Sequence, residues 1–458
     1  MLDKSTDVFA RVLIPSGALG LNYDAVALDR ALEMKPDLIA IDGGSTDSGP
    51  AYLGQGMSKY ARSSTKTEWA GLMAARRKAD VPLVIGTAGT CGTDSAVDWL
   101  LDITREIAEE TGDHPKVAVL RSSQDSAAMA EAFRAGRIKP LPAAPEVDAD
   151  LVASCTNIVA LAGAEQIQAA LATGAEIVIA GRTTDTATIA AVPLAKGCHA
   201  GGAWHGAKIG ECGALCATNP QSGVIVVEFD EEGFTVTPTA DGAHATPHTV
   251  SAHMLYENSD PFILHEPGGY LDVTGSGYRA LDERRVRVTG SAWVPSETYT
   301  VKLEGARLAG YRTVVMAMLR DRRYVENAGA WAEDIEAKCR AKIEARMDLN
   351  PDDYDLELRL MGIDATLGEL EARVAAPLEV GVMGIVTAPT PEQSSEAAKM
   401  LNPYLLHHPL TQEEEQPTFA FPLSPAELTG GPVHAFCLYH VLELSDPMEA
   451  FRLEVVQL

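Results

Sequence analysis

Short apolar runs alternate with segments of helical spacing over residues 11 to about 196, and this alternation constrains the fold most strongly. The apolar runs are rich in Val, Ile and Leu without polar alternation, as expected when helices cover both faces of a sheet. Six runs follow this pattern: RVLIPSG, DLIAIDGG, PLVIGTAG, KVAVLRS, NIVALAG and EIVIAGR. Between them, residues 65–79 and 95–112 have helical spacing. The sequence predicts an α/β fold whose N-terminal half, residues 1–200, is an open, mostly parallel sheet with ligand-binding loops.

The pattern changes after residue 200, where strand-turn-strand segments replace the alternation. Residues 223–238 predict a β-hairpin that turns at Glu231-Glu232-Gly233. We therefore expect a mixed, β-rich region over residues 201–307 that completes a cleft. Residues 308–458 predict an α+β domain, so the C-terminal half as a whole is expected to be mixed or antiparallel. Its expected strands lie at 311–319, 355–361 and 378–386, and its expected helices at 326–347 and 391–401.

Composition and charge exclude several classes of function. The 458 residues are 46% hydrophobic, and 64 acidic residues against 37 basic ones give a net charge of −27. This acidity, without a block of Lys and Arg, disfavours binding to nucleic acid or to an anionic membrane surface. The start of the chain lacks a secretion signal, no uncharged apolar segment approaches about 18 residues, and seven scattered cysteines suit reduced thiols. These features favour a cytoplasmic protein, and a homo-oligomer is expected.

Three Thr-Asp pairs follow short apolar runs, as Thr46-Asp47, Thr93-Asp94 and Thr184-Asp185. Each pair is expected at the carboxyl end of a parallel strand, where a helix begins. Ligands bind at this edge of open α/β sheets, because loops from different strands converge there and helix N-termini expose unpaired N–H groups. Thr, Ser and Asp are also favoured helix caps, so simple capping remains an alternative for each turn.

The turns combine glycine with hydroxyl groups, which suits anion binding. Glycine lets backbone N–H groups approach an anion, hydroxyls donate hydrogen bonds, and Arg182 can hold a carboxylate or phosphate with two parallel bonds. The predicted ligand is therefore a small-molecule carboxylate or an acyl-CoA. Its predicted binding residues in the turns are Gly44, Ser45, Thr46, Thr90, Thr93, Arg182, Thr183 and Thr184.

The aspartates of the turns do not fit a simple anion site, since Asp47, Asp94 and Asp185 would repel the ligand. They would have to orient hydroxyls, act as bases or hold a divalent metal. Carboxylates that converge raise one another's pKa, which suits general acid–base catalysis. We expect all three as candidate catalytic residues, and a metal at this Asp cluster remains an alternative.

Further polar residues lie in the segment WHGAKIGECGALC, residues 204–216. Lys208 and Glu211 are spaced i, i+3 and would share a helix face, so Lys208 is a candidate catalytic residue and Glu211 a candidate binding residue. A solvated ion pair is the alternative. His205, Cys212 and Cys216 have no second Cys or His pair to complete a zinc motif, so buried cysteines are the favoured interpretation and no metal ligand is assigned.

Two other polar residues complete the set of candidates. Pro247 before His248 fits the first turn of a helix capped by Thr246, and His248 is a candidate for proton transfer, with a structural histidine as the alternative. Lys302 and Glu304 are spaced i, i+2 and would lie on one strand face. Lys302 is therefore a candidate binding residue, and a solvent-facing pair is the alternative.

Motifs along nearly the whole chain resemble the acyclic terpene utilisation (AtuA) family. They are GGSTDSGP, GTAGTCGTD, AGRTTDTA, AKIGECGAL, TPHTVSAHMLYENSDPF, EPGGYLDVT, VKLEGA and NPYLLHHPL. The resemblance implies a catabolic role in the use of acyclic terpenoids such as citronellol and geraniol through CoA thioesters. It also implies a separate small partner protein of about a hundred residues. No catalytic assignment comes with the resemblance.

Two classes of function follow. In the first, which we favour, the chain is a lyase or hydratase acting on a branched or carboxylated small molecule, with CoA as a part of the substrate. The turns hold a carboxylate or enolate while an Asp, His248 or Lys208 moves a proton next to the carbonyl. A hydrolase or acyl transferase that uses Cys91 is a further enzyme alternative. In the second class, the chain is a substrate-binding or scaffolding subunit that a small partner protein completes.

Overall fold

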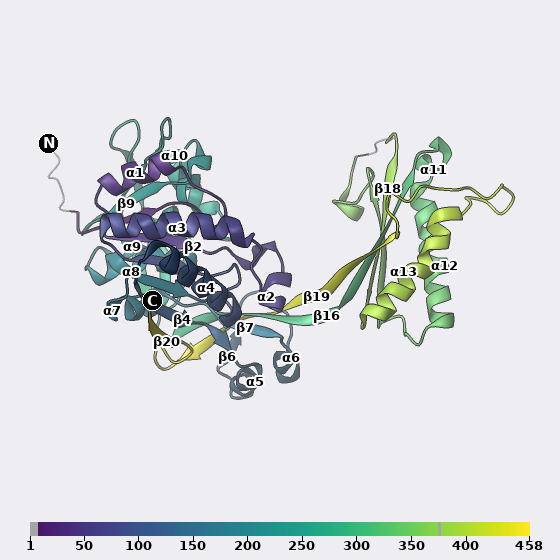
Figure 1. Ribbon diagram of the computed structural model, residues 1–458, viewed down its shortest axis with the longest axis horizontal. Coiled ribbons are helices and arrows are strands. Elements are labelled where there is room, and N and C mark those ends of the chain that lie inside the picture. The colour runs from purple at the N-terminus through teal and green to yellow at the C-terminus, as the bar shows by residue number, and fades with distance from the viewer. Residues whose placement is uncertain (1–7, 374–376) are drawn as a thin grey trace. The chain divides into compact units, whose positions relative to one another are not determined.

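The computed structural model describes residues 8–373 and 377–458 (Figure 1). Residues 1–7, which belong to the N-terminal segment expected to lack a secretion signal, lie outside this part. The chain forms two compact units, of which unit 1 comprises the residues up to Arg307 together with 436–458, and unit 2 comprises 308–435. Helices alternate with central parallel strands in unit 1, and the later sheets are antiparallel. The predicted α/β fold class is confirmed.

A ten-stranded sheet forms the centre of unit 1. Its five middle strands are parallel and follow the order β1 (Ala10–Ile14), β2 (Leu38–Asp42), β3 (Leu83–Gly86), β8 (Ile177–Ala180) and β4 (Lys116–Arg121). Antiparallel strands extend both ends of this core. They are β9 (Ile225–Phe229), β10 (Gly233–Pro238), β14 (Val286–Thr289) and β13 (Gly277–Ala280) beyond β1, and β20 (Arg452–Gln457) beyond β4.

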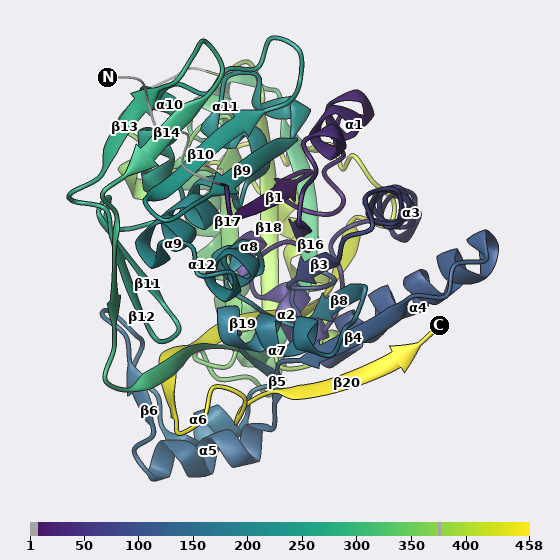
Figure 2. The same ribbon diagram turned by 90° about the vertical axis from the view of Figure 1, so that its left-hand side faces the viewer.

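Helices cover both faces of this sheet, as the uninterrupted apolar strands predict (Figure 2). Alternate strand residues enter two hydrophobic cores, since Leu38 and Ala40 join one cluster and Ile39 and Ile41 join the other. On the first face lie α7 (Ala164–Ala172), α8 (Asp185–Ala195) and α9 (Ala200–Gly210). On the second face lie α1 (Ala25–Glu33), α3 (Arg62–Ala79) and α4 (Asp94–Thr111).

One of the six predicted parallel strands belongs to a different sheet. The run NIVALAG forms β7 (Asn157–Ala160), which pairs antiparallel with β16 (Tyr299–Leu319) and with β5 (Ser123–Gln124). The prediction of a parallel strand here is wrong. The physical reason is that β7 is also largely buried, so its apolar composition cannot distinguish the two sheets.

The predicted hairpin over 223–238 is confirmed, since β9 and β10 pair antiparallel on either side of Asp230–Glu232. A three-stranded sheet of order β11-β12-β15 lies nearby in the sequence. The remaining elements of unit 1 are α2 (Ala51–Gln55), α5 (Ser126–Arg134), β6 (Ile138–Pro140), α6 (Ala149–Ala153), α10 (Pro247–Ala252), β11 (Ile263–Glu266), β12 (Gly269–Asp272), β15 (Ala292–Pro295) and the short 3-10 helices η1 (Thr46–Ser48), η2 (Gly213–Cys216), η3 (Pro220–Ser222) and η4 (His253–Leu255).

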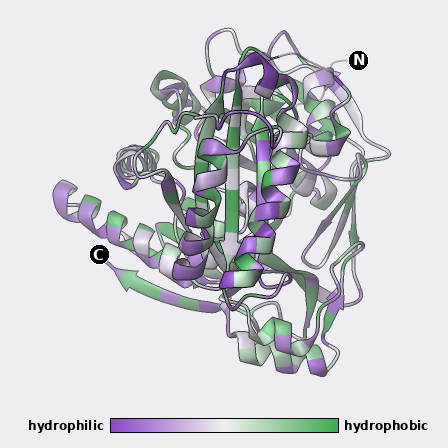
Figure 3. Cartoon of the chain, turned by 90° about the vertical axis from the view of Figure 1, so that its right-hand side faces the viewer, coloured by the Kyte–Doolittle hydropathy of each residue, from purple (hydrophilic) through white to green (hydrophobic). Residues whose placement is uncertain are grey.

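Unit 2 has a core of its own, built between antiparallel strands and helices (Figure 3). Residues 311–319 of β16 pair with β18, and β18 pairs with β17. Trp331 is buried in this core and donates its indole N–H to the carbonyl of His408 at 2.8 Å. The elements that contribute residues to unit 2 are α11 (Arg322–Glu326), α12 (Ala328–Arg346), β17 (Asp355–Met361), η5 (Gly368–Leu370), β18 (Val380–Ala388), α13 (Pro391–His407) and β19 (Glu427–Leu444).

The strands and helices expected in this segment are confirmed, although β16 begins at Tyr299, before the expected 311, and α13 extends to His407, beyond the expected 401. Across the described residues, none of the helices is long and apolar enough to cross a membrane.

Candidate functional site

The three Thr-Asp turns converge because β2, β3 and β8 are neighbours in the parallel order. Backbone bonds join their ends: the N–H of Gly43 donates to the carbonyl of Gly86 at 2.8 Å, and the N–H of Thr87 donates to that of Gly181 at 2.8 Å. The carboxyl ends of the strands therefore form one edge, as expected for a ligand site in an open α/β sheet.

Arg182 connects the turns of this edge through buried hydrogen bonds. Its Nε and Nη2 atoms donate to the two carboxylate oxygens of Glu304 at 3.0 and 3.2 Å, and Nη1 donates to Thr87 Oγ1 at 3.1 Å. Thr46 Oγ1, from the first turn, donates to Glu304 Oε2 at 3.0 Å. All four side chains belong to buried residues. One buried ion pair thus links all three turns through hydrogen bonds.

The charges of this pair stabilise each other. Burial alone would raise the pKa of Glu304, but the positive charges of Arg182 and Lys302 lower it to about 2. Burial alone would lower the pKa of Arg182, and Glu304 instead raises it. The donors of Arg182 therefore point to protein groups. We expected Arg182 to hold a substrate carboxylate, whereas its contacts make it part of the wall behind the site.

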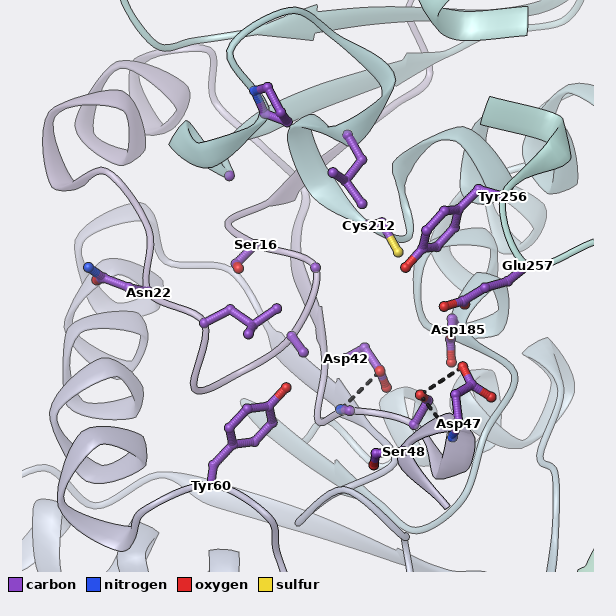
Figure 4. A pocket seen from close by; sticks show the side chains of 18 of the residues that line it. Ser16, Asn22, Asp42, Asp47, Ser48, Tyr60, Asp185, Cys212, Tyr256 and Glu257 are labelled. Carbon is purple, nitrogen blue, oxygen red and sulfur yellow. Dashed lines mark hydrogen bonds between the residues drawn. The ribbon is translucent and has the colours of Figure 1, made fainter. Parts of the chain in front are cut away.

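A pocket of about 500 Å³ opens at this edge within unit 1 (Figure 4). Its volume lies in the range of small-molecule sites. Four acidic side chains line it together with one lysine. The lining residues are Ser16, Gly17, Ala18, Leu21, Asn22, Asp42, Gly44, Ser45, Asp47, Ser48, Lys59, Tyr60, Asp185, Cys212, Leu215, Pro220, Gln221, Gly223, Tyr256 and Glu257.

Asp42, the last residue of β2, lines the pocket although it is only 6% exposed. Its Oδ2 accepts the N–H of Gly44 at 2.9 Å, whereas the buried Oδ1 has no hydrogen-bond partner among the described residues. Burial and the negative charge of Asp185 raise the pKa of Asp42 well above its usual range. Asp42 is therefore a carboxyl group that keeps a proton at higher pH than usual.

Asp185, at the first position of α8, lies on the same pocket. Its Oδ1 atom is 3.8 Å from Nη1 of Arg182. Burial raises the pKa of Asp185, and the positive charges of Arg182 and Lys208 oppose part of this rise. Burial raises the pKa of both aspartates and Arg182 lowers both, but the charge of Asp185 raises the pKa of Asp42 while Lys208 lowers that of Asp185. Such a difference separates the roles of acid and base in enzymes.

Lys208 and Glu211 share a face of α9, as their spacing predicts, and form a buried ion pair through Nζ and Oε1. Lys208 Nζ also donates to the carbonyl of Tyr256 at 2.8 Å. The pair lies behind the pocket wall rather than in its lining. Burial raises the pKa of Glu211 to about 8, against the opposing charge of Lys208. The alternative of a solvated pair is wrong, because both side chains are at most 5% exposed.

A further buried carboxyl adds to the negative charge. Glu266, at the end of β11, accepts the hydroxyl of Thr186 at 2.5 Å, and its second oxygen has no partner in the described part of the chain. Burial raises its pKa to about 7. Negative charge is thus concentrated around the pocket and only partly compensated by Lys208 and Arg182.

Of the residues singled out in the turns, four line the pocket: Gly44, Ser45, Asp47 and Asp185. The second turn has mainly a structural role, since Thr93 caps α4 and Asp94 forms an ion pair with Arg452 of β20. Thr46, Thr90, Thr183 and Thr184 lie behind the lining, and Thr90 accepts the N–H of Lys59 at 3.2 Å. Thr184 occupies the cap position of α8 without a capping bond from its side chain.

Two other candidates lie away from the pocket lining. His248 is exposed on α10, whose predicted cap Thr246 is confirmed. Lys302 shares a strand face with Glu304, and its Nζ lies 3.3 Å from Glu304 Oε1. The structure thus brings Lys302 to the Arg182–Glu304 pair but does not bring His248 to the other candidates.

His205, Cys212 and Cys216, from the segment 204–216, have different roles. His205 is buried and bonds Ser291 Oγ at 2.8 Å and the hydroxyl of Tyr278 at 3.2 Å through its two ring nitrogens, so it is a structural residue. Cys216 is also buried. Within the described residues, one group of metal-ligating side chains has its donor atoms within 4.8 Å of one another. It consists of Glu211, Cys212 and His253, and contains none of the three Thr-Asp aspartates.

Sequence reasoning missed several pocket residues, chiefly Asp42, Tyr60, Tyr256 and Glu257. Asp42 had a usable signal, because a charged residue that ends a fully apolar strand is costly unless it has a role. The burial of Tyr60 and the charge of Asp42 raise the pKa of its phenol to about 12. Tyr256 and Glu257 belong to the segment after α10. No local sequence pattern predicts that this segment reaches the pocket.

The family model described as "Acyclic terpene utilisation family protein AtuA" matches residues 58–418, which include Asp185, Lys208 and His253 but not Asp42. Searches of curated proteins and of solved structures found no match. The matched segment spans most of the 458 residues and agrees with the motifs that suggested this family. The chain therefore belongs to the acyclic terpene utilisation (AtuA) family.

Proposed function

We propose that the chain is a lyase or hydratase that removes or adds water in the pocket, with Asp42 as general acid and Asp185 as general base. The observation that carries this proposal is a pair of carboxyl groups, one at the end of β2 and one after β8, that line one pocket in different charge environments. Elimination of water requires a base that takes the proton and an acid that protonates the leaving hydroxyl.

In the direction of dehydration, the carboxylate of Asp185 takes the proton from the carbon next to the carbonyl. The electron pair of that C–H bond forms the carbon–carbon double bond, and the C–O bond to the hydroxyl breaks. Asp42 gives its proton to the leaving hydroxyl, which departs as water. Solvent then returns a proton to Asp42 and accepts one from Asp185.

The charge of the pocket favours a substrate whose reacting end is neutral. Even without the protonated Asp42, the carboxyl groups of Asp47, Asp185 and Glu257 outnumber Lys59 in the lining, so a free carboxylate would meet net repulsion. A thioester has a neutral carbonyl, and we therefore favour an acyl thioester, with CoA as the carrier, over the free carboxylic acid. Ala18, Leu21, Leu215 and Pro220 give the pocket an apolar part that suits a branched hydrocarbon.

The alternative of a Cys91 nucleophile has weaker support. Cys91 is fully buried and outside the lining, and its Sγ lies 3.4 Å from Thr93 Oγ1. Burial raises the pKa of its thiol, whereas nucleophilic cysteines have lowered pKa values. The alternative of a binding subunit differs from an enzyme in one measurable way, because it predicts no turnover by the isolated chain.

The test is turnover of branched 3-hydroxyacyl thioesters, followed by the ultraviolet absorption of the enoyl product. Asp185→Asn and Asp42→Asn should each lower kcat by about 10²- to 10⁴-fold, the usual contribution of one acid or base. Asp94→Asn is the matched control, because Asp94 belongs to a Thr-Asp turn but not to the pocket lining. Full activity of Asp185→Asn, with wild-type activity established, would contradict the proposal. A lack of turnover by the wild-type chain with every thioester would favour the binding subunit.

A further inference from the structure

Three side chains with metal-binding chemistry meet at the end of α9. Glu211 follows the last residue of this helix, Cys212 comes next, and His253 begins η4. One donor atom from each lies within 4.8 Å of the other two. A zinc ion with bonds of about 2.0 Å to nitrogen and 2.3 Å to sulfur requires tetrahedral donors closer than this, so modest side-chain rotation would close the site.

His253 is the observation that distinguishes this group from a chance cluster. It is 5% exposed, and its Nε2 atom is buried without a hydrogen-bond partner among the described residues. A buried polar atom without a partner costs free energy, and native structures usually satisfy it. His205, a buried structural histidine of the same region, has both ring nitrogens bonded. His253 therefore has an unfilled bonding position that a metal ion would occupy.

The surroundings of the group favour a cation. Two further carboxyl groups, of Asp185 and Glu266, lie near Glu211, and that of Glu257 lies near Lys208. Lys208 is the cation bonded to Glu211. A divalent ion would add positive charge next to these carboxyl groups.

We propose that Glu211, Cys212 and His253 bind one Zn²⁺ ion, with the fourth position open to the pocket. Carboxylate, thiolate and imidazole form a donor set that suits zinc, whereas Mg²⁺ and Ca²⁺ prefer oxygen donors alone. Cys212 lines the pocket, so the free position lies on the side from which a small molecule enters. Binding displaces the thiol proton of Cys212 to solvent, because the thiolate is the ligand.

Zinc binding is independent of the acid–base reaction proposed for Asp42 and Asp185. A bound ion would hold water or the oxygen of a bound molecule at its open position. Its test therefore measures the metal itself and not activity.

The experiment uses the full chain, stripped of metal with a chelator and dialysed. Zn²⁺ is titrated in competition with a chromophoric chelator, and Co²⁺ is added separately as a spectroscopic probe. We expect one tightly bound Zn²⁺ per chain, and a cobalt spectrum with a thiolate charge-transfer band in the near ultraviolet. Cys212→Ser should remove that band, and both Cys212→Ser and His253→Gln should weaken Zn²⁺ binding at least tenfold. Cys216→Ser is the matched control, because Cys216 is four residues further on and outside the group.

Absence of stoichiometric Zn²⁺ binding by the wild-type chain would overturn the proposal. So would Zn²⁺ affinity that Cys212→Ser and His253→Gln leave unchanged while circular dichroism shows both variants to be folded. If these variants do not fold, X-ray absorption of the zinc-loaded wild-type chain decides. One sulfur with nitrogen and oxygen neighbours is the expected shell, and a shell without sulfur contradicts the proposal.

Discussion

Arg182 shows most clearly how contacts define the role of a residue. An arginine in a turn of glycine and threonine suggests a ligand-binding group, yet its Nε and Nη2 donate to Glu304 and its Nη1 donates to Thr87. Glu304 lies 122 residues away along the chain, so no local pattern predicts this bond. Arg182 acts on the pocket by holding Glu304 and by placing positive charge 3.8 Å from Asp185.

Replacement of Arg182 by methionine is expected to lower stability as well as activity. The substitution would remove the main partner of the buried Glu304 carboxylate and leave it only Lys302 and Thr46, whereas complete loss of a partner costs about 3–5 kcal/mol in other proteins. Chemical denaturation of Arg182→Met would measure this loss. The double variant Arg182→Met/Glu304→Gln should regain part of it, because the uncompensated charge is removed. A single variant with wild-type stability would show that the pair is unimportant to the fold.

Glu266 provides a pH-dependent prediction. Its pKa is raised by burial from 4.5 to about 7, so the folded state binds a proton more tightly than the unfolded state does. The contribution of this carboxyl to stability is therefore full below about pH 4.5 and is lost as the pH rises through about 7. Glu266→Gln should raise the melting temperature relative to wild type at pH 8 and gain less at pH 5. An equal shift at both pH values would contradict the raised pKa.

Local spacing predicted some of the site residues and not others. Lys208 and Glu211 could be paired from sequence because residues at i, i+3 share a helix face. Asp42 could not be placed with Asp185, because their proximity depends on the order of strands far apart in the sequence. The same holds for His253, whose relation to Cys212 depends on how the segment after α10 packs against α9.

Helix α9 carries Lys208 and leads into Glu211, and glycine lets it pack closely on its neighbours. A Cβ atom at Gly202 would lie 2.7 Å from the backbone Cα of Gly233 in β10, a distance that real contacts do not allow. A Cβ atom at Gly210, on the same helix, would meet side-chain carbon atoms at an ordinary 3.4 Å. Small residues on one face of α9 thus fix its position on the sheet.

Alanine at these two glycines should have opposite effects. Gly202→Ala would push α9 from β10 and is expected to cost about 1–3 kcal/mol, as overpacking does. Gly210→Ala should be neutral or stabilising by about 0.4–1 kcal/mol, because alanine favours the helix and restricts the unfolded chain. Urea denaturation of both variants measures the difference. Equal loss of stability in both would show that helix packing does not depend on Gly202.

The elements themselves were largely predictable, and their partners were less so. The β9–β10 hairpin and helices such as α12 follow from turn residues and from spacing within a short segment. The placement of β8 between β3 and β4, and the antiparallel pairing of β7 with β16, depend on contacts across long stretches of chain. Apolar composition alone is the same for both kinds of strand.

At the scale of the whole molecule, two observations indicate a role in small-molecule metabolism. They are membership of the acyclic terpene utilisation family and the composition of the pocket. The chain has a net charge of −27, and the pocket is acidic as well, because carboxyl groups outnumber the one lysine in its lining. This excess of negative charge is the reason that a neutral thioester and a zinc ion both suit the site better than a free carboxylate does. Assembly with further copies or with a small partner protein stays a prediction.

Hydrogen exchange in D₂O tests the central claim, the division of roles between Asp185 and Asp42, most directly. A branched 3-hydroxyacyl thioester is incubated with each protein, and NMR follows both deuterium at the carbon next to the carbonyl and formation of the enoyl product. Wild type should give both, and Asp185→Asn neither. Asp42→Asn should still exchange the proton but lose water slowly, because the base remains and the acid is absent. Undiminished exchange by Asp185→Asn would contradict the account.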